Sequence, residues 1–225
     1  MVQKIGPVSD AALSGGGNLG AGLTGPYAGA YILQINGITF PCYDFGTLAQ
    51  ISQEIDIGSA GFGGVVQMTR KVFSPPGGRF TRYLDEISNP TNSVANVTVQ
   101  VESSLASAGN TKVVVDPATT NNTYAVTDSN GVCCQPALAY VFEGPGANLQ
   151  VSSTQFQNAS GNVSYRWDIS IAPGQTLILM HFAVQALDDA SAKSEAQVLV
   201  NLDDPDALDS MSLTERSQVA NFVVP

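Results

Sequence analysis

The sequence predicts a mainly β protein, an antiparallel β-sandwich with short helices near its C-terminal end. Short apolar runs recur at close spacing over most of the 225 residues, and turns rich in Gly, Pro, Asn and Asp separate them. Several runs alternate between apolar and polar residues, which is typical of a strand with one buried face. Many short strands at this spacing, with little helix, indicate a sandwich or a barrel.

The N-terminal part of the chain divides into an arm and a first hairpin. Residues 1–30 are rich in Gly and Ala and poor in charge, which predicts a flexible or extended arm. Residues 31–225 are expected to form a single β-sandwich domain with a helical C-terminal segment. The dipeptide Asn36-Gly37 separates two apolar runs, which is a strong signal for a hairpin with a type I′ turn.

Ten further strands are expected after this hairpin. Their residues are 51–57, 65–73, 79–87, 94–102, 112–115, 124–127, 137–142, 149–152, 163–171 and 176–185, and a Gly-rich loop is expected at 58–64. The alternation in 163–171 places Trp167 inward. The run at 176–185 is apolar on both faces, so it should be a central strand that is covered on two sides.

The strands at 65–73 and 79–87 form a basic hairpin. It contains four of the nine Lys and Arg residues of the chain: Arg70, Lys71, Arg79 and Arg82. One interpretation is a polar cleft for sugar hydroxyls, with these carbohydrate-binding residues: Arg79, Arg82, Tyr83 and Asp85. The favoured interpretation is cross-strand ion pairing with Asp85, Glu86 and neighbouring strands, which sets the register and contributes about 0.2–1 kcal/mol per pair.

The C-terminal part of the chain changes from strands to helices. Residues 190–202 can form one helix. Ser212 and Glu215 fit a capping box, which should begin a second helix at Leu213 that extends to about residue 221. An apolar tail at 222–224 follows.

His181 is the only histidine in the sequence. It lies in the apolar run LILMHFAVQ, so a buried histidine that is hydrogen-bonded to a neighbour is the favoured interpretation. The alternative is the general acid of a mutarotase-like sugar epimerase, which needs an acid and a base on either side of a sugar ring. No serine lies in a G-x-S-x-G motif, so a serine hydrolase is not expected.

A dense acidic cluster near the C-terminal helices is a candidate calcium site. Its residues are Asp203, Asp204, Asp206 and Asp209, which offer the hard oxygen ligands that Ca²⁺ prefers. The ligand spacing of an EF-hand is absent and Pro205 interrupts the cluster. Helix capping is therefore the favoured interpretation, and no cofactor is expected.

The chain has three cysteines: Cys42, Cys133 and Cys134. A disulfide between Cys42 and Cys133, or between Cys42 and Cys134, is geometrically more reasonable than one between adjacent residues. Three reduced thiols are the alternative. The absence of any C-x-x-C motif argues against a zinc site.

The composition restricts the class of partner. The net charge is −10, which argues against nucleic acid because phosphate binding requires a basic surface. No apolar run approaches the roughly 20 residues of a membrane span. Charged residues make up 12% of the chain, and small hydroxyl and amide side chains are frequent, as in many extracellular β proteins.

Four segments resemble a module of large bacterial extracellular proteins, in which it is one unit among many β-domains. They are TRKVFSPPGGRFTRYLDEISNPTNS, ALAYVFEGPGA, YRWDISIAPGQTLILMHFAVQ and LVNLDDPDALDSMSLTERSQVANF, and they span roughly residues 30–223. The long paired strands are more weakly similar to the supersandwich of the galactose-mutarotase type. The resemblance implies an extracellular accessory or structural module and carries no catalytic residues with it.

The predicted function is that of a non-enzymatic β-sandwich, outside the cell or on its surface, with a role in structure or assembly. The expected partners are other copies of the chain or neighbouring extracellular domains, since the terminal segments could add a strand to a neighbour. A carbohydrate-binding module and a mutarotase-like epimerase are the alternatives.

Overall fold

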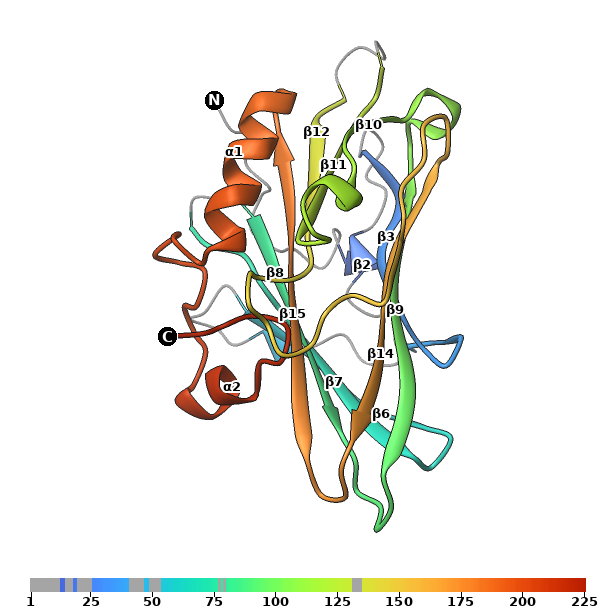
Figure 1. Cartoon of the computed structure of the whole chain (residues 1–225), viewed down its shortest axis with the longest axis vertical. Helices are drawn as coiled ribbons and strands as arrows, with labels where there is room; N and C mark the ends of the chain where they lie inside the picture. The colour runs from blue at the N-terminus through green and yellow to red at the C-terminus, as the bar shows by residue number, and fades with distance from the viewer. Residues whose placement is uncertain are drawn as a thin grey trace.

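The computed structural model describes residues 26–40, 54–76, 78, 80–130 and 135–225, together with short paired strands at 13–14, 18–19 and 47–48. In this part of the chain, two antiparallel sheets pack face to face, and two α-helices cover the outer side of one sheet (Figure 1). The predicted β-sandwich with short C-terminal helices is confirmed.

The first sheet contains seven described strands and lies on the side away from the helices (Figure 1). Its order is β1-β2-β3-β9-β14-β13, and β4 pairs with β3. The strands are β1 (Leu13–Ser14), β2 (Asn18–Leu19), β3 (Tyr27–Ile35), β4 (Ile38–Thr39), β9 (Ala95–Leu105), β13 (Ser153–Gln155) and β14 (Asn162–Ile171). Because β3 begins at Tyr27, the last residues of the predicted arm belong to this sheet.

The second sheet contains eight described strands in the order β10-β11-β12-β15-β8-β7-β6-β5. The strands are β5 (Thr47–Leu48), β6 (Glu54–Phe62), β7 (Val66–Phe73), β8 (Phe80–Ser88), β10 (Lys112–Val115), β11 (Tyr124–Asp128), β12 (Ala137–Val141) and β15 (Thr176–Ala186). The basic hairpin forms β7 and β8, and β15 lies between β8 and β12.

Two apolar clusters hold the layers together. The larger cluster lies between the two sheets and contains the inward-facing residues of β14, including Trp167, which is fully buried as the alternation predicts. The smaller cluster lies between the second sheet and the helices and includes Phe182 of β15 and Leu199. β15 contributes to both clusters, which confirms the prediction of a central strand covered on two faces.

The helices are α1 (Asp189–Val200) and α2 (Leu213–Gln218), with short 3₁₀ turns η1 (Ala108–Asn110) and η2 (Pro117–Thr119) between strands. Asp188 caps α1 by accepting a hydrogen bond from Ser191 N at 2.7 Å. The predicted capping box of Ser212 and Glu215 is present at the start of α2. None of the helices in the described residues is long and apolar enough to cross a membrane.

The turn between β3 and β4 has the predicted chemistry. Asn36 and Gly37 have φ values of 51° and 76°, the two left-handed conformations that a type I′ turn requires. Asn and Gly adopt this conformation more readily than other residues, so the dipeptide specifies the hairpin. Ile35 and Ile38 are paired directly across the turn.

Three sequence-based expectations of local structure are wrong. The helix expected from Leu213 to about residue 221 ends at Gln218, because Val219 is extended and forms a bridge with Ile178. The loop expected at 58–64 is largely strand, because β6 continues to Phe62 and the pairing with β7 shifts register between Ile57 and Ala60. The bulge allows a glycine-rich segment to keep its backbone hydrogen bonds with β7. The strand expected at 149–152 lies a few residues later, at β13, whose three residues are register partners of β14.

The segment 219–222 is built into the sandwich. Val219 forms a parallel bridge with Ile178 of β15, at the end of β15 that β12 does not reach. The buried side chain of Asn221 donates to Phe142 O and Met180 O, both at 2.7 Å, and accepts from Met180 N at 2.9 Å. Phe222 is buried against Phe182 in an edge-to-face contact. The apolar tail therefore packs on its own domain, with Val224 also partly buried against the smaller cluster.

Candidate functional site

Arg70 on β7 and Asp85 on β8 form an ion pair inside the sandwich. The two residues are register partners, and neither side chain has any exposed surface. Arg70 Nε lies 2.6 Å from Asp85 Oδ1, and Arg70 Nη2 lies 2.9 Å from Asp85 Oδ2. Two parallel bonds fix the orientation of the guanidinium as well as its position. For this pair, the favoured prediction of cross-strand ion pairing is confirmed.

The third bond of Arg70 reaches the opposite sheet. Arg70 Nη1 donates to the carbonyl of Tyr31 on β3 at 2.6 Å. Tyr31 has a φ of 55° where the pairing of β3 with β9 shifts register, and its N–H donates to Ser103 Oγ at 3.0 Å. Such a conformation is kept only where the surroundings hold it. Here the Tyr31 ring stacks on Tyr83 with the ring centroids 4.8 Å apart.

His181 extends this network across the core. From β15, His181 Nε2 lies 2.9 Å from Asp85 Oδ2, and His181 Nδ1 lies 2.9 Å from Tyr165 Oη on β14. The histidine side chain is completely buried, and its ring stacks on that of Tyr83 at 4.9 Å. The prediction of a buried, hydrogen-bonded histidine is confirmed. We call Arg70, Asp85, His181 and Tyr165 the buried polar chain.

The ionisation states in the buried polar chain follow from its partners. Burial on its own would raise the pKa of Asp85, but the charge and hydrogen bonds of Arg70, together with the His181 hydrogen bond, lower it to about 2. Burial lowers the pKa of His181, against the opposing effect of its hydrogen bond to Asp85. A neutral imidazole has one donor nitrogen, and a carboxylate only accepts. His181 Nε2 therefore donates to Asp85, and Nδ1 accepts the Tyr165 hydroxyl proton.

The buried polar chain is closed to a substrate in this structure. A general acid or base must come within about 2.6–3.2 Å of the group that it serves, directly or through one water. Arg70, Asp85 and His181 have zero exposed surface, and each ring nitrogen of His181 already has a partner. The arrangement can fix the relative position of β7, β8, β15 and the first sheet.

The residues proposed for sugar contact lie inside the sandwich or outside the described residues. Tyr83 and Asp85 point between the sheets, while Arg82 points toward the helices, where Nη1 donates to Ala207 O at 2.8 Å and Nη2 to Glu54 Oε2 at 3.1 Å. Alternation along β8 separates Arg82 from Tyr83 and Asp85. Side chains without exposed surface offer no atom to a sugar at the surface. Arg79 lies outside the described residues.

The predicted calcium ligands do not converge. No group of three or more His, Cys, Asp or Glu residues with metal-site geometry occurs in the part of the chain that the structure describes. Asp204 is buried, and its Oδ1 accepts a hydrogen bond from Asp206 N at 2.9 Å, which stabilises a local turn. The predicted disulfide partners Cys42 and Cys133, and also Cys134, lie outside the described residues.

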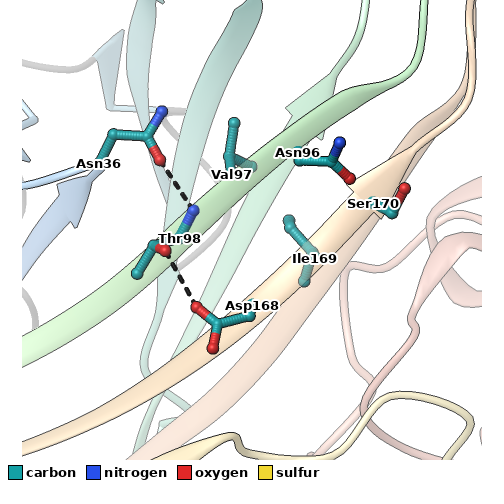
Figure 2. Close-up of a pocket in the computed structure, with 7 residues that line it drawn as sticks. All are labelled: Asn36, Asn96, Val97, Thr98, Asp168, Ile169 and Ser170. Carbon is teal, nitrogen blue, oxygen red and sulfur yellow. Dashed lines mark hydrogen bonds between the residues drawn. The ribbon is translucent and has the colours of Figure 1, made fainter.

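A polar hollow lies on the solvent side of the first sheet (Figure 2). Its volume is about 300 Å³, and the β3–β4 turn, β9 and β14 supply its lining. The lining residues are Asn36, Asn96, Val97, Thr98, Asp168, Ile169 and Ser170. The side chains of Val97 and Ile169 are buried in the core, and the accessible lining is about half polar and half apolar. We call this the Asn36–Asp168 hollow.

Hydrogen bonds between neighbouring elements hold the hollow in shape. Asn36 N donates to Thr98 O at 2.9 Å, and Thr98 N donates to Asn36 Oδ1 at 2.9 Å (Figure 2). The Asn36 side chain thus continues the hydrogen bonding between β3 and β9 beyond the end of β3. Thr98 Oγ1 donates to Asp168 Oδ1 at 2.9 Å, and Arg166 Nη2 to Asp168 Oδ2 at 3.0 Å. The Thr98 hydrogen bond and, more weakly, Arg166 lower the pKa of Asp168.

The outward positions of Asn96, Thr98, Asp168 and Ser170 follow from the alternation along β9 and β14. Their convergence depends on the pairing of β9 with β14, which sets Thr98 opposite Asp168 and Asn96 opposite Ser170. Periodicity within each strand contains no information about that pairing. Tyr31 and Tyr165 were missed as partners of the buried polar chain for the same reason.

No protein-family model and no curated protein sequence matches the chain. Solved structures do match. One is a candidate aldose 1-epimerase from Klebsiella pneumoniae subsp. pneumoniae, at 9% identity and a TM-score of 0.43, over 64% of this chain and 53% of that chain. Another is a candidate kojibiose phosphorylase from the human microbiome, at 8% identity and a TM-score of 0.49, over 82% of this chain and 25% of that chain.

A heparan sulfate lyase from Pedobacter heparinus matches at 8% identity and a TM-score of 0.45, over 70% of this chain and 24% of that chain. The match thus spans about half of the epimerase and about a quarter of the other two proteins. At these identities the likeness concerns the fold.

Proposed function

We propose that this chain is a non-catalytic β-sandwich module with a role in structure or assembly. One observation supports the proposal above others: the only histidine and the carboxylate beside it are completely buried and bound to fixed partners. A mutarotase-like mechanism would need an acid and a base that reach a sugar ring. In this proposal, the hydrogen bonds of the buried polar chain form in only one strand register of the second sheet, and they link that sheet to the first.

A buried ion pair suits this role better than it suits simple stabilisation. Removing two charges from water costs free energy that their attraction barely recovers, so the pair contributes little net stability, and in this proposal it serves specificity instead. Arg70 finds its bonding partners only when β7, β8 and β3 are in the observed register. A register shift would leave a buried charge without a partner, which is strongly unfavourable.

Anomer equilibration tests the non-catalytic proposal. Freshly dissolved α-D-galactose should equilibrate in the presence of the protein at the rate seen in buffer alone, as followed by polarimetry or by the anomeric proton signals. Any protein-dependent acceleration would overturn the proposal. Loss of such an acceleration in His181→Gln, with an unchanged circular dichroism spectrum, would assign it to the epimerase alternative.

The assembly part of the proposal concerns the N-terminal arm. The segment 219–222 packs on its own domain, whereas β1 and β2 of the arm form an edge of the first sheet, where pairing with a strand of a neighbour could occur. The low charged content of 12% supports a setting outside the cell. Sedimentation velocity should find oligomers of the full chain and monomers after deletion of residues 1–25. Equal behaviour of the two chains would exclude assembly through the arm.

A further inference from the structure

The Asn36–Asp168 hollow has hydrogen-bonding groups that the fold leaves unused. Within the described residues, the Asn36 amide nitrogen and the side chains of Asn96 and Ser170 take part in no hydrogen bond. Asp168 accepts from Thr98 and Arg166, which leaves part of its capacity of about four acceptor sites free. Donors and acceptors therefore both line the same small volume.

These groups are held in place before any ligand arrives. Asn36 is fixed at both its backbone N–H and its side-chain oxygen by Thr98, so its amide nitrogen must point away from β9. Asp168 is fixed by Thr98 Oγ1 and Arg166, and its backbone N–H donates to Ser152 Oγ at 2.8 Å. Fixed groups lose little conformational entropy on binding, which favours affinity.

The chemistry of the lining indicates the class of ligand. An anion is disfavoured, because Asp168 is charged, Arg166 is already paired with it, and the chain carries a net charge of −10. A purely apolar ligand is disfavoured, because about half of the accessible lining is polar. A carboxylate between carboxamides and hydroxyls matches neighbouring hydroxyl groups, each of which donates and accepts a hydrogen bond.

We propose that the Asn36–Asp168 hollow binds a neutral saccharide, with Asp168 accepting hydrogen bonds from adjacent sugar hydroxyls and Asn36 and Asn96 bonding their neighbours. The volume of about 300 Å³ lies at the lower end of the range for small-molecule sites, so it suits a terminal sugar residue or a short glycan. The lining contains no aromatic ring on which a sugar could stack. The dissociation constant is therefore expected on the order of 1 mM, as for a weak single-site contact.

The test combines a titration with matched variants. The ¹⁵N-labelled full chain is titrated with the methyl α-glycosides of glucose, galactose and mannose, each up to tens of millimolar. Neutral oligosaccharides are added in the same way in a second series. At least one probe should shift amide signals of residues 36, 96–98 and 168–170. Asp168→Ala should weaken that binding by about tenfold, because it removes one strong hydrogen bond to the sugar. Ser170→Ala should weaken it by about threefold, because it removes one ordinary hydrogen bond. Ser164→Ala is the matched control, because Ser164 is an outward-facing serine of β14 outside the hollow.

Each outcome decides the proposal. Shifts confined to the hollow, lost in Asp168→Ala and retained in Ser164→Ala, support it. No shift with any neutral probe overturns it, and so do shifts that Asp168→Ala leaves unchanged. Binding of sulfated or uronic glycans that becomes stronger in Asp168→Ala overturns the neutral class. Dispersed amide spectra of all three variants verify that each is folded.

Discussion

Arg70 and Asp85 face each other across β7 and β8 at positions without any solvent exposure, joined by two bonds of 2.6 and 2.9 Å. Asp85→Asn should therefore leave a buried guanidinium without its counter-charge. The free energy of unfolding should fall by about 3–5 kcal/mol, as for other broken buried pairs. Urea denaturation followed by tryptophan fluorescence, through the buried Trp167, measures this loss.

The control for this prediction is a partly exposed ion pair. Lys112 and Asp189 lie 3.7 Å apart with exposed side-chain fractions of 49% and 32%. Lys112→Ala should cost less than about 1 kcal/mol. Replacing both buried partners, as in Arg70→Met with Asp85→Leu, should recover part of the loss from Asp85→Asn. A cost for Asp85→Asn no larger than that of Lys112→Ala would contradict the structural role of the pair.

His181 should make the fold less stable as the pH falls. Burial lowers its pKa in the folded state, so below the ordinary histidine value of about 6.5 the unfolded chain binds the proton more readily. The stability that His181 contributes is thus complete above that value and is lost as the pH falls through it. His181→Gln should remove this slope from the unfolding free energy between about pH 7 and pH 5. An identical slope in the variant would show that the imidazole does not titrate as inferred.

Glu143 should have the opposite effect. Its side chain is buried, accepts a hydrogen bond from Val151 N, and has its pKa raised by burial to about 7. Between the unfolded value of 4.5 and about 7, the unfolded chain loses the proton first, so stability falls as the pH rises. Glu143→Gln keeps an acceptor for Val151 N and removes the charge. It should stabilise the fold by on the order of 1 kcal/mol at about pH 8 and by much less at about pH 5.

Thermal unfolding of both proteins at the two pH values checks the Glu143 prediction. The matched control is Glu102→Gln, since Glu102 lies on the partly exposed outer face of β9. A gain from Glu143→Gln that is independent of pH would contradict the assignment of a titrating buried carboxyl.

Asn221 should be among the most sensitive positions near the end of the chain. Asn221→Ala removes three hydrogen bonds to the buried backbone of residues 142 and 180 and leaves those groups unsatisfied. The expected cost is about 2–4 kcal/mol. Asn201→Ala, at an exposed position after α1, should change stability by less than about 0.5 kcal/mol. Urea midpoints of the two variants test the difference, and equal midpoints would exclude an anchoring role for Asn221.

Patterns within single strands predicted much of this fold. The inward position of Trp167, the burial of β15 on both faces and the Asn36-Gly37 turn all follow from alternation or from backbone preferences over a few residues. The capping box of α2 is also local, since its two partners are three residues apart. Such features are determined by chemistry that the sequence displays directly.

The interior positions of the charged residues could not be predicted in the same way. Arg82, Tyr83 and Asp85 look like surface residues, yet each is buried because its partners come from distant segments. Asp85 meets a residue 96 positions later, and Arg82 bonds a backbone carbonyl 125 positions later. The segment 219–222 has neither an apolar–polar alternation nor a turn signal from which its position beside β15 could be predicted.

The position of residues 219–222 beside β15 determines when the domain can be completed during synthesis. Asn221 joins backbone groups that were made 41 and 79 residues earlier. Until it leaves the ribosome, one end of β15 and the adjoining loop after β12 have unpaired backbone and uncovered apolar side chains, a state open to wrong pairing. A nascent chain arrested with residues 219–222 still inside the exit tunnel should remain sensitive to protease, and a C-terminal linker long enough to bring this segment out of the tunnel should protect it.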